Sequence, residues 1–311
     1  MKNLFTSPDG TAPSELCFGA MQFGGKASAD ESHGLYDACR AAEINFFDTA
    51  YVYTDGASET LLGKFARPER EKLIIATKCA WKDGAGTTNI NAQFDESRAR
   101  LGMDMVDILY LHRFDPETDL SESFAALAEL RRVGKIRYVG LSNFSAWQVM
   151  KAANVAAQFD LPITILQPMY NLVKRQAEVE ILPMALSEGI AVAPYSPLGG
   201  GLLTGKYASG EGGRLFDDSS YTKRYGPQWM HETATALKEL ATEVGQHPAT
   251  LAVAWVAQNA AITAPIISAR SVEQLRPSLS AAKFEMSDAL YRKMCDLSPT
   301  PPPATDRLEE A

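Results

Sequence analysis

The feature that most constrains the fold is a regular alternation of short apolar runs with longer amphipathic stretches along the 311-residue chain. Two of the apolar runs, LIIAT and VDILYL, contain few polar residues, which is typical of parallel strands buried on both faces. Eight strands are predicted, at Leu16–Ala20, Asn45–Asp48, Leu73–Lys78, Val106–His112, Ile136–Gly140, Thr164–Gln167, Ile190–Pro194 and Pro265–Ser268.

Helices are predicted between these strands, and several carry end signals. Ser121 precedes an apolar periodicity, and Ser271 has Gln274 three residues later, as in a capping box. Gly134 and Gly189 stand where helices are expected to end. The predicted helices are Ser32–Ala42, Glu59–Ala66, Asn89–Leu101, Ser121–Val133, Ala146–Gln158, Ala177–Ser187, Met230–Val244, Pro248–Asn259 and Val272–Ala282.

Eight strand–helix units without a break in composition predict an α/β fold, a single-domain (β/α)8 TIM barrel over residues 1–311. The alternative is an open doubly wound sheet, which is disfavoured because GAMQFGG lacks the GxGxxG spacing. Residues 207–228, rich in Gly, Ser and Asp, are predicted to be a mobile loop insertion. Residues 299–311 contain three consecutive prolines and are predicted to be an extended tail.

Composition excludes several classes of protein. A net charge of −8 argues against general nucleic-acid binding. No run approaches the ~18 apolar residues of a membrane span, and no signal peptide is visible. The four cysteines are far apart and form no CxxC pair, which predicts free thiols and no metal site. We therefore expect a cytoplasmic protein with a small-molecule partner, and its oligomeric state stays open.

Titratable residues stand at the carboxyl ends of consecutive predicted strands. Asp48 ends the second, with Tyr53 five residues later, Lys78 ends the third, and His112 ends the fourth. Active sites of such barrels lie at this end. Each residue alone could be a helix cap, a turn residue, a solvated strand end or a core histidine. Together they predict one catalytic site.

These four residues suit the reduction of a carbonyl group. The Lys78 ammonium should stabilise a tyrosinate and lower the pKa of Tyr53 from ~10, and Asp48 should keep Lys78 charged. Tyr53 could then donate a proton near neutral pH, while His112 orients the carbonyl oxygen. No side chain supplies a hydride, so a nicotinamide cofactor is implied.

Five segments resemble the successive signatures of the aldo-keto reductase superfamily, and of its bacterial and potassium-channel-β-like branches in particular. The resemblance covers about Leu16 to Ala282. It implies NADPH-dependent, reversible reduction of an aldehyde or ketone to an alcohol, with Tyr53 as the general acid in reduction. The segments are FFDTAYVYTDGASETLLGKF, IIATK, VDILYLHRFDP, GKIRYVGLSNF and APYSPLGGGLLTGKY.

The resemblance also implies an extended NADPH (NADP⁺) across the barrel mouth. Polar residues ending strands five and six would hold the nicotinamide amide, and Tyr195 would stack on the ring. The glycine-rich loop after strand seven would cover the pyrophosphate. Arg270 at a helix start suits a 2′-phosphate and favours NADPH over NADH. The implied cofactor residues are Met21, Ser142, Asn143, Gln167, Tyr195, Ser196, Pro197, Leu198, Gly200, Gly205, Lys206, Ala269, Arg270, Ser271 and Gln274.

Two positions depart from the family pattern. Ser268 replaces a usual glycine, and Ser278 replaces an asparagine or similar residue that often meets adenine. The substrate pocket is predicted from loop residues, and its mixed lining suits a sugar-derived or a polycyclic carbonyl compound. The candidate lining residues are Met21, Trp81, Phe114, Tyr225 and Trp229.

Two other functions compete with this reading. An aldolase-like barrel would use Lys78 as a Schiff base, but the Tyr53 and His112 partners and the cofactor loop disfavour it. A regulatory module like the channel β subunits would bind NADPH with slow turnover. The absence of an extended segment before the first predicted strand disfavours a channel partner.

Overall fold

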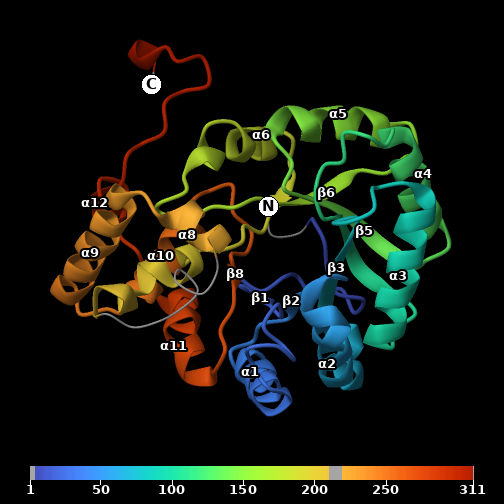
Figure 1. Ribbon diagram of the computed structural model, residues 1–311, viewed down its shortest axis with the longest axis horizontal. Helices are drawn as coiled ribbons and strands as arrows, with labels where there is room; N and C mark the ends of the chain where they lie inside the picture. The colour runs from blue at the N-terminus through green and yellow to red at the C-terminus, as the bar shows by residue number, and fades with distance from the viewer. Residues whose placement is uncertain (1–3, 210–218, 311) are drawn as a thin grey trace.

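Eight parallel strands surround a common axis in the computed structural model, which describes residues 4–209 and 219–310 (Figure 1). Their order is β7-β6-β5-β4-β3-β2-β1-β8. Ile266 N donates to Pro194 O at 2.9 Å, and Tyr195 forms a parallel bridge with Ile266, which closes the remaining gap. The (β/α)8 barrel is therefore confirmed. The strands are β1 Cys17–Gly19, β2 Phe46–Asp48, β3 Ile74–Cys79, β4 Val106–Leu111, β5 Ile136–Ser142, β6 Ile163–Gln167, β7 Ala191–Val192 and β8 Ile266–Ile267.

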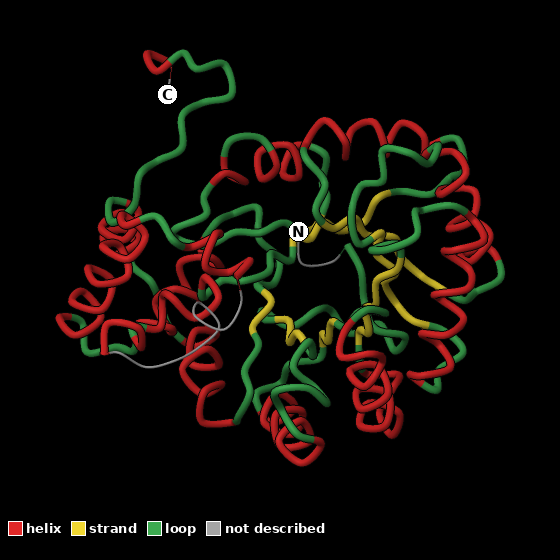
Figure 2. Tube along the Cα trace, viewed as in Figure 1, coloured by secondary structure: helices red, strands yellow, loops and turns green. Residues whose placement is uncertain are grey.

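Helices cover the outside of the barrel (Figure 2). Every predicted helix overlaps an observed one. Within the described residues, no helix has both the length and the apolar character needed to cross a membrane. The α-helices are α1 Ala29–Ala41, α2 Ala57–Ala66, α3 Thr87–Leu101, α4 Leu120–Arg132, α5 Ala146–Ala157, α6 Ile181–Ser187, α8 Ser219–Tyr225, α9 Gln228–Glu243, α10 Pro248–Gln258, α11 Val272–Ser280 and α12 Asp288–Cys295.

The structure differs from the sequence-based expectations in several local features. Helix α4 is capped by Asp119, whose side chain accepts from Ser121 N at 2.8 Å, so Ser121 is not the cap. Helix α12 was not predicted, and α8 lies inside the segment 207–228 that was predicted to be a loop. Residues 210–218 of that segment, and residue 311 of the tail, lie outside the described residues. The C-terminal tail runs away from the barrel (Figure 1) and ends in a short 3-10 turn, Leu308–Glu310.

Alternate residues of the strands fill the barrel interior with apolar side chains. Gly140 is needed there, because a Cβ on it would lie 2.4 Å from the Tyr110 ring. Strand residues alternate between the two faces, so the inward register continues to the carboxyl ends of the strands. The last inward-facing side chains are polar, namely Asp48, Lys78, His112, Ser142 and Gln167.

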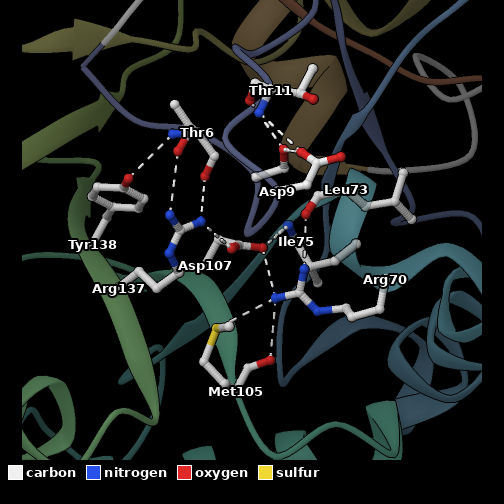
Figure 3. A network of polar contacts seen from close by, with 11 residues as sticks. Thr6, Asp9, Thr11, Arg70, Leu73, Ile75, Met105, Asp107, Arg137 and Tyr138 are labelled. Atoms are coloured by element: carbon white, nitrogen blue, oxygen red, sulfur yellow. Dashed lines mark hydrogen bonds and ion pairs between the residues drawn. The ribbon is translucent and has the colours of Figure 1, made fainter.

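The opposite end of the barrel is closed by a network around Asp107 (Figure 3). This buried carboxylate accepts from Ile75 N at 2.8 Å and pairs with Arg70 at 2.8 Å and Arg137 at 2.9 Å. Arg137 also donates to the Thr6 carbonyl. The neighbouring Phe5 ring is buried against Phe46 and Tyr138, at centroid distances of 5.4 and 6.1 Å. The N-terminal segment thus plugs this end of the barrel.

Substituting Asp107 tests the importance of this plug. Asp107→Ala leaves two arginines without their shared carboxylate, and breaking a buried ion pair from one side costs about 3–5 kcal/mol. We expect a loss of this size in the free energy of unfolding, measured by urea denaturation. The exposed Asp296 gives the control, because its change to alanine should cost less than about 0.5 kcal/mol. Equal losses in the two variants would contradict this account of the network.

Candidate active site

Asp48 and Lys78 form a buried ion pair where β2 and β3 end. Lys78 Nζ lies 2.6 Å from Asp48 Oδ2, and the two side chains are 0% and 4% exposed. Nζ also donates to Thr49 O at 2.6 Å. Gln167, from β6, donates its Nε2 to the other carboxylate oxygen at 2.9 Å. The pair is therefore fixed on both sides by polar partners.

Tyr53 lies on a 3-10 turn, Tyr53–Gly56, between β2 and α2. Its Oη is 3.2 Å from Lys78 Nζ. Thr54 and Asp55, which follow it, have φ values of 46° and 51°, in the left-handed region that costs a residue with a Cβ roughly 1–2 kcal/mol. Thr54 Oγ1 donates to Phe23 O at 2.8 Å and helps to hold this bend. The bend returns the phenol to the end of β3.

Two outer-helix residues that the sequence analysis did not single out support this turn. Arg100, on α3, donates to Tyr51 O at 2.8 Å and to Glu59 Oε2 at 3.2 Å. Glu59 is fully buried and also accepts from Thr77 Oγ1 at 2.6 Å. Gly56 leaves room for Arg100, because a Cβ would lie 2.5 Å from its Nε. Glu59 could have been noticed in the sequence, because it is an acidic residue on the inner face of the predicted helix Glu59–Ala66.

His112 follows β4 and faces the tyrosine. Its ring lies 5.9 Å from the Tyr53 ring and 4.8 Å from the Trp81 ring, between centroids. Its Nδ1 is buried without a hydrogen-bond partner among the described residues. Burial, together with the charges of Lys78 and Arg113, lowers the pKa of His112 to about 2. The imidazole is therefore neutral, with one N–H to donate.

The pKa of Tyr53 differs from the sequence-based expectation. Burial is the largest influence and raises it, while the Lys78 ammonium lowers it without prevailing, so the pKa of Tyr53 lies above its usual value. The predicted lowering is therefore wrong in sign. For Lys78, burial lowers the pKa, but the attraction of Asp48 and Tyr53 outweighs it and holds the pKa above its usual value. The site presents a protonated phenol beside an ammonium group.

The residues expected to hold an amide meet at one rim. Asn143 Nδ2 donates to the His112 carbonyl at 2.9 Å, and Tyr195 Oη donates to Asn143 Oδ1 at 2.8 Å. Ser142 Oγ donates to Gln167 O at 3.2 Å. Asn143 has a φ of 59°, a conformation that asparagine tolerates better than most residues. Ser142, Asn143, Gln167 and Tyr195 are thus brought together beside His112.

The predicted pyrophosphate loop follows β7. It bends sharply, since Gly199, Gly200 and Gly201 have φ values of 57°, 67° and 98°. A Cβ on Gly200 would lie 2.6 Å from the Tyr221 ring of α8, so glycine permits the contact between loop and helix. The loop begins with Ser196, Pro197 and Leu198, forms a 3-10 segment at Gly199–Thr204, and continues through Gly205 into the 3-10 turn Lys206–Ser209.

The predicted 2′-phosphate site lies at the start of α11. Ser271 Oγ accepts from Gln274 N at 3.4 Å, and Gln274 Oε1 accepts from Arg270 N at 3.3 Å. The predicted capping box is thus only half formed, because the glutamine caps Arg270 instead of Ser271. The Ser268 and Ser278 hydroxyls are buried without partners among the residues described. Buried unpaired hydroxyls are rare and suit contact with a ligand.

The other predicted positions are spread around the mouth. Ala269 is 8% exposed, and Met21 is half-buried just after β1. Tyr225 is fully buried, with Oη 3.4 Å from Asn171 Nδ2, so its prediction as a pocket-lining residue is wrong. The structure places three further side chains at the surface or partly exposed, namely Trp81, Phe114 and Trp229.

Comparisons with known proteins agree with this geometry. The chain matches the Aldo/keto reductase family over residues 15–298. It is 32% identical to the uncharacterized oxidoreductase YrpG of Bacillus subtilis (strain 168), over 97% of both chains. It is 34% identical to a probable voltage-gated potassium channel subunit beta of Oryza sativa subsp. japonica, over 90% of both.

A third similar protein is the L-glyceraldehyde 3-phosphate reductase of Escherichia coli (strain K12), which is 31% identical over 76% of this chain and 75% of its own. These matches confirm the resemblance to the bacterial and channel-β-like branch that the motifs indicated. The family match covers nearly the whole barrel, including all eight strands. The chain therefore belongs to the aldo/keto reductase family of oxidoreductases.

Proposed function

We propose that this protein catalyses the reversible, NADPH-dependent reduction of an aldehyde or ketone to an alcohol. The observation that carries the proposal is the Tyr53 phenol held 3.2 Å from a buried ammonium group and facing the neutral imidazole of His112. This arrangement offers a proton donor and a neutral N–H donor to one carbonyl oxygen.

Each side chain has a separate part in the proposed reaction. Bound NADPH supplies the hydride that no side chain provides. His112 orients the carbonyl oxygen, and Tyr53 Oη donates a proton to that oxygen as negative charge develops there. Lys78 stabilises the tyrosinate left behind, and Asp48 keeps Lys78 charged and in place. In the oxidation direction Tyr53 takes the proton back.

The residues present fit NADPH. Donors and acceptors of Ser142, Asn143 and Gln167 meet beside His112, where they would hold a carboxamide, and Tyr195 offers an aromatic face. The glycine turn after β7 exposes backbone to a pyrophosphate. Arg270 and the first turn of α11 would hold the 2′-phosphate. The hydroxyls of Ser268 and Ser278, buried and without a partner in the part of the chain that the structure describes, support a ligand at this end.

The aldolase alternative is disfavoured by the state of Lys78. A Schiff-base lysine must lose its proton to become a nucleophile. Lys78 is fully buried, donates to three oxygens and has a raised pKa. The channel-subunit alternative is distinguished by turnover, because a regulatory module would bind NADPH and reduce carbonyl compounds only slowly.

The proposed substrate is a small carbonyl compound, either sugar-derived or polycyclic. A similar protein is named as a reductase of a phosphorylated aldehyde, which supports the sugar-derived class. The partly exposed Trp81 beside His112 supports an aromatic one. We place the reaction in the cytoplasm, where the four free cysteines would stay reduced.

Removing the phenol hydroxyl tests the mechanism directly. Tyr53→Phe should lower kcat/KM by at least roughly 10²-fold, because general acid catalysis contributes that much, and should leave NADPH binding unchanged. The measurement is loss of NADPH absorbance with a panel of aldehydes. Tyr51→Phe is the matched control, since its hydroxyl donates to Glu96 at the surface, and it should keep near-normal activity. Carbonyl reduction that persists in Tyr53→Phe would contradict the mechanism.

The pH profile follows from the two pKa shifts. Reduction needs protonated Tyr53, and its raised pKa keeps it protonated beyond the ordinary ~10. His112 stays neutral, because its pKa is lowered to about 2. We therefore expect kcat/KM for reduction to be level from about pH 5 to about pH 8 and to fall only in strong alkali. An acidic limb centred near the usual histidine value of ~6.5 would contradict this assignment.

Cofactor choice tests the site at α11. In Arg270→Ala the Kd for NADPH should rise about tenfold to a hundredfold, because a charge-assisted contact contributes roughly 1.5–3 kcal/mol. The Kd for NADH should stay the same. Arg276 is an exposed arginine farther along α11, so Arg276→Ala is the control and should change neither value. If the ratio of the Kd for NADH to the Kd for NADPH is the same in both variants, Arg270 does not bind the 2′-phosphate.

A further inference from the structure

Two amide side chains on the outer helix α3 hold the turn that follows β3. Gln93 is 4% exposed, and its Oε1 accepts from Ala80 N at 2.8 Å. Its Nε2 donates to Lys82 O at 3.3 Å and to Asn89 Oδ1 at 2.9 Å. Asn89 in turn donates to Lys82 O at 2.9 Å and to Gly84 O at 2.6 Å. We call Gln93 and Asn89 the amide clamp.

The turn needs such a clamp because its backbone is strained. Ala80 has a φ of 62° and Asp83 a φ of 65°. For an alanine, this left-handed conformation costs roughly 1–2 kcal/mol, and its side chain makes no local hydrogen bond in return. The bond from Ala80 N to buried Gln93 holds this conformation from outside the turn. The clamp therefore fixes the direction in which the next side chain, Trp81, leaves the backbone.

Trp81 is the part of the turn that meets the catalytic residues. Its ring lies 4.8 Å from the His112 ring, inclined at 51°. The Arg113 guanidinium lies over the same indole, 5.4 Å from its centroid. The side chain is still 38% exposed, so part of the indole is open to solvent. Trp81 is thus a wall beside the imidazole that would orient the carbonyl oxygen.

We propose that Gln93, supported by Asn89, sets which carbonyl compounds the site accepts, by holding Trp81 against His112. Gln93 is a positioning residue, because it acts through Trp81 and does not reach the reacting atoms. A fixed, partly exposed indole offers stacking area to a flat aromatic carbonyl compound and little to a small aliphatic one. This inference rests on the proposed carbonyl reduction, and it selects the aromatic class of substrate over the sugar-derived class.

The test compares two aldehydes in a Gln93→Met variant, which keeps the length of the side chain and removes its hydrogen bonds. With NADPH present, kcat/KM for 2-naphthaldehyde should fall by up to roughly tenfold, mainly through KM, as expected when one stacking contact is lost. The value for propanal should change less than about twofold. A clamp that merely stabilised the fold would lower both alike, so equal losses would overturn the proposal.

A double-substitution cycle shows whether Gln93 acts through Trp81. Trp81→Ala should give the same loss of selectivity, and Trp81→Ala with Gln93→Met should lose no more than Trp81→Ala alone. Losses of selectivity that add in the double variant would overturn the proposed route through Trp81.

Asn45→Leu is the matched control. Asn45 is also a buried amide that holds a loop, through Ser14 N at 2.8 Å and Ala12 O at 2.9 Å, but at the opposite end of the barrel. It should reduce stability and leave the ratio between the aldehydes unchanged.

A measurement without turnover separates this inference from the proposed function. Acrylamide quenching of Trp81 fluorescence, taken as the difference from Trp81→Phe, should increase when Gln93→Met is introduced. No change would overturn the clamp, whatever the enzyme reduces. If quenching increases while the unaltered protein reduces neither aldehyde, the clamp is supported, and both the proposed function and the selectivity argued from it fail.

Discussion

The buried ion pair of Asp48 and Lys78 is the constraint on which the rest of the site depends. Removing two charges from water is expensive, and the mutual attraction offsets it only when the remaining polar atoms are also satisfied. Here Gln167, the Thr49 carbonyl and Tyr53 complete the set. The pair stands at the ends of β2 and β3, and its partners come from β6 and from the segment that follows β2, so a stable pair requires several strand ends to be held in register.

The fold, and the meeting of the proposed catalytic residues at one rim, could be predicted from the sequence because they follow from regular geometry. Parallel strands end on one side of a barrel, so Asp48, Lys78 and His112 had to meet. The pKa of Tyr53 could not be read in this way, because its sign depends on a balance between burial and one ammonium group at a specific distance. Contacts such as Arg100 with Tyr51 join residues far apart in sequence and leave no periodic signal.

The base of the barrel contributes to stability and the mouth carries the candidate site, as is usual for this architecture. At the base, Asp107 is shared by two arginines and the N-terminal segment is locked in place. At the mouth, the Nδ1 of His112 and the hydroxyl of Ser268 are buried but unpaired among the residues that the structure describes. The carboxylate of Asp107 at the base is thus fully paired, whereas these two polar atoms at the mouth are available to a ligand.

Non-glycine residues with a left-handed backbone at the barrel mouth limit which stabilising substitutions this protein can accept. Ala80, Asn143 and Ser196 follow β3, β5 and β7 along the chain, and all have φ values near 60°. Glycine would relieve the conformational cost at each position, but it would also give the rim more freedom of motion. A gain in thermal stability from glycine at these three positions would thus make the rim of the barrel mouth less rigid. We therefore expect stabilising substitutions to accumulate at the base of the barrel and on the outer helices.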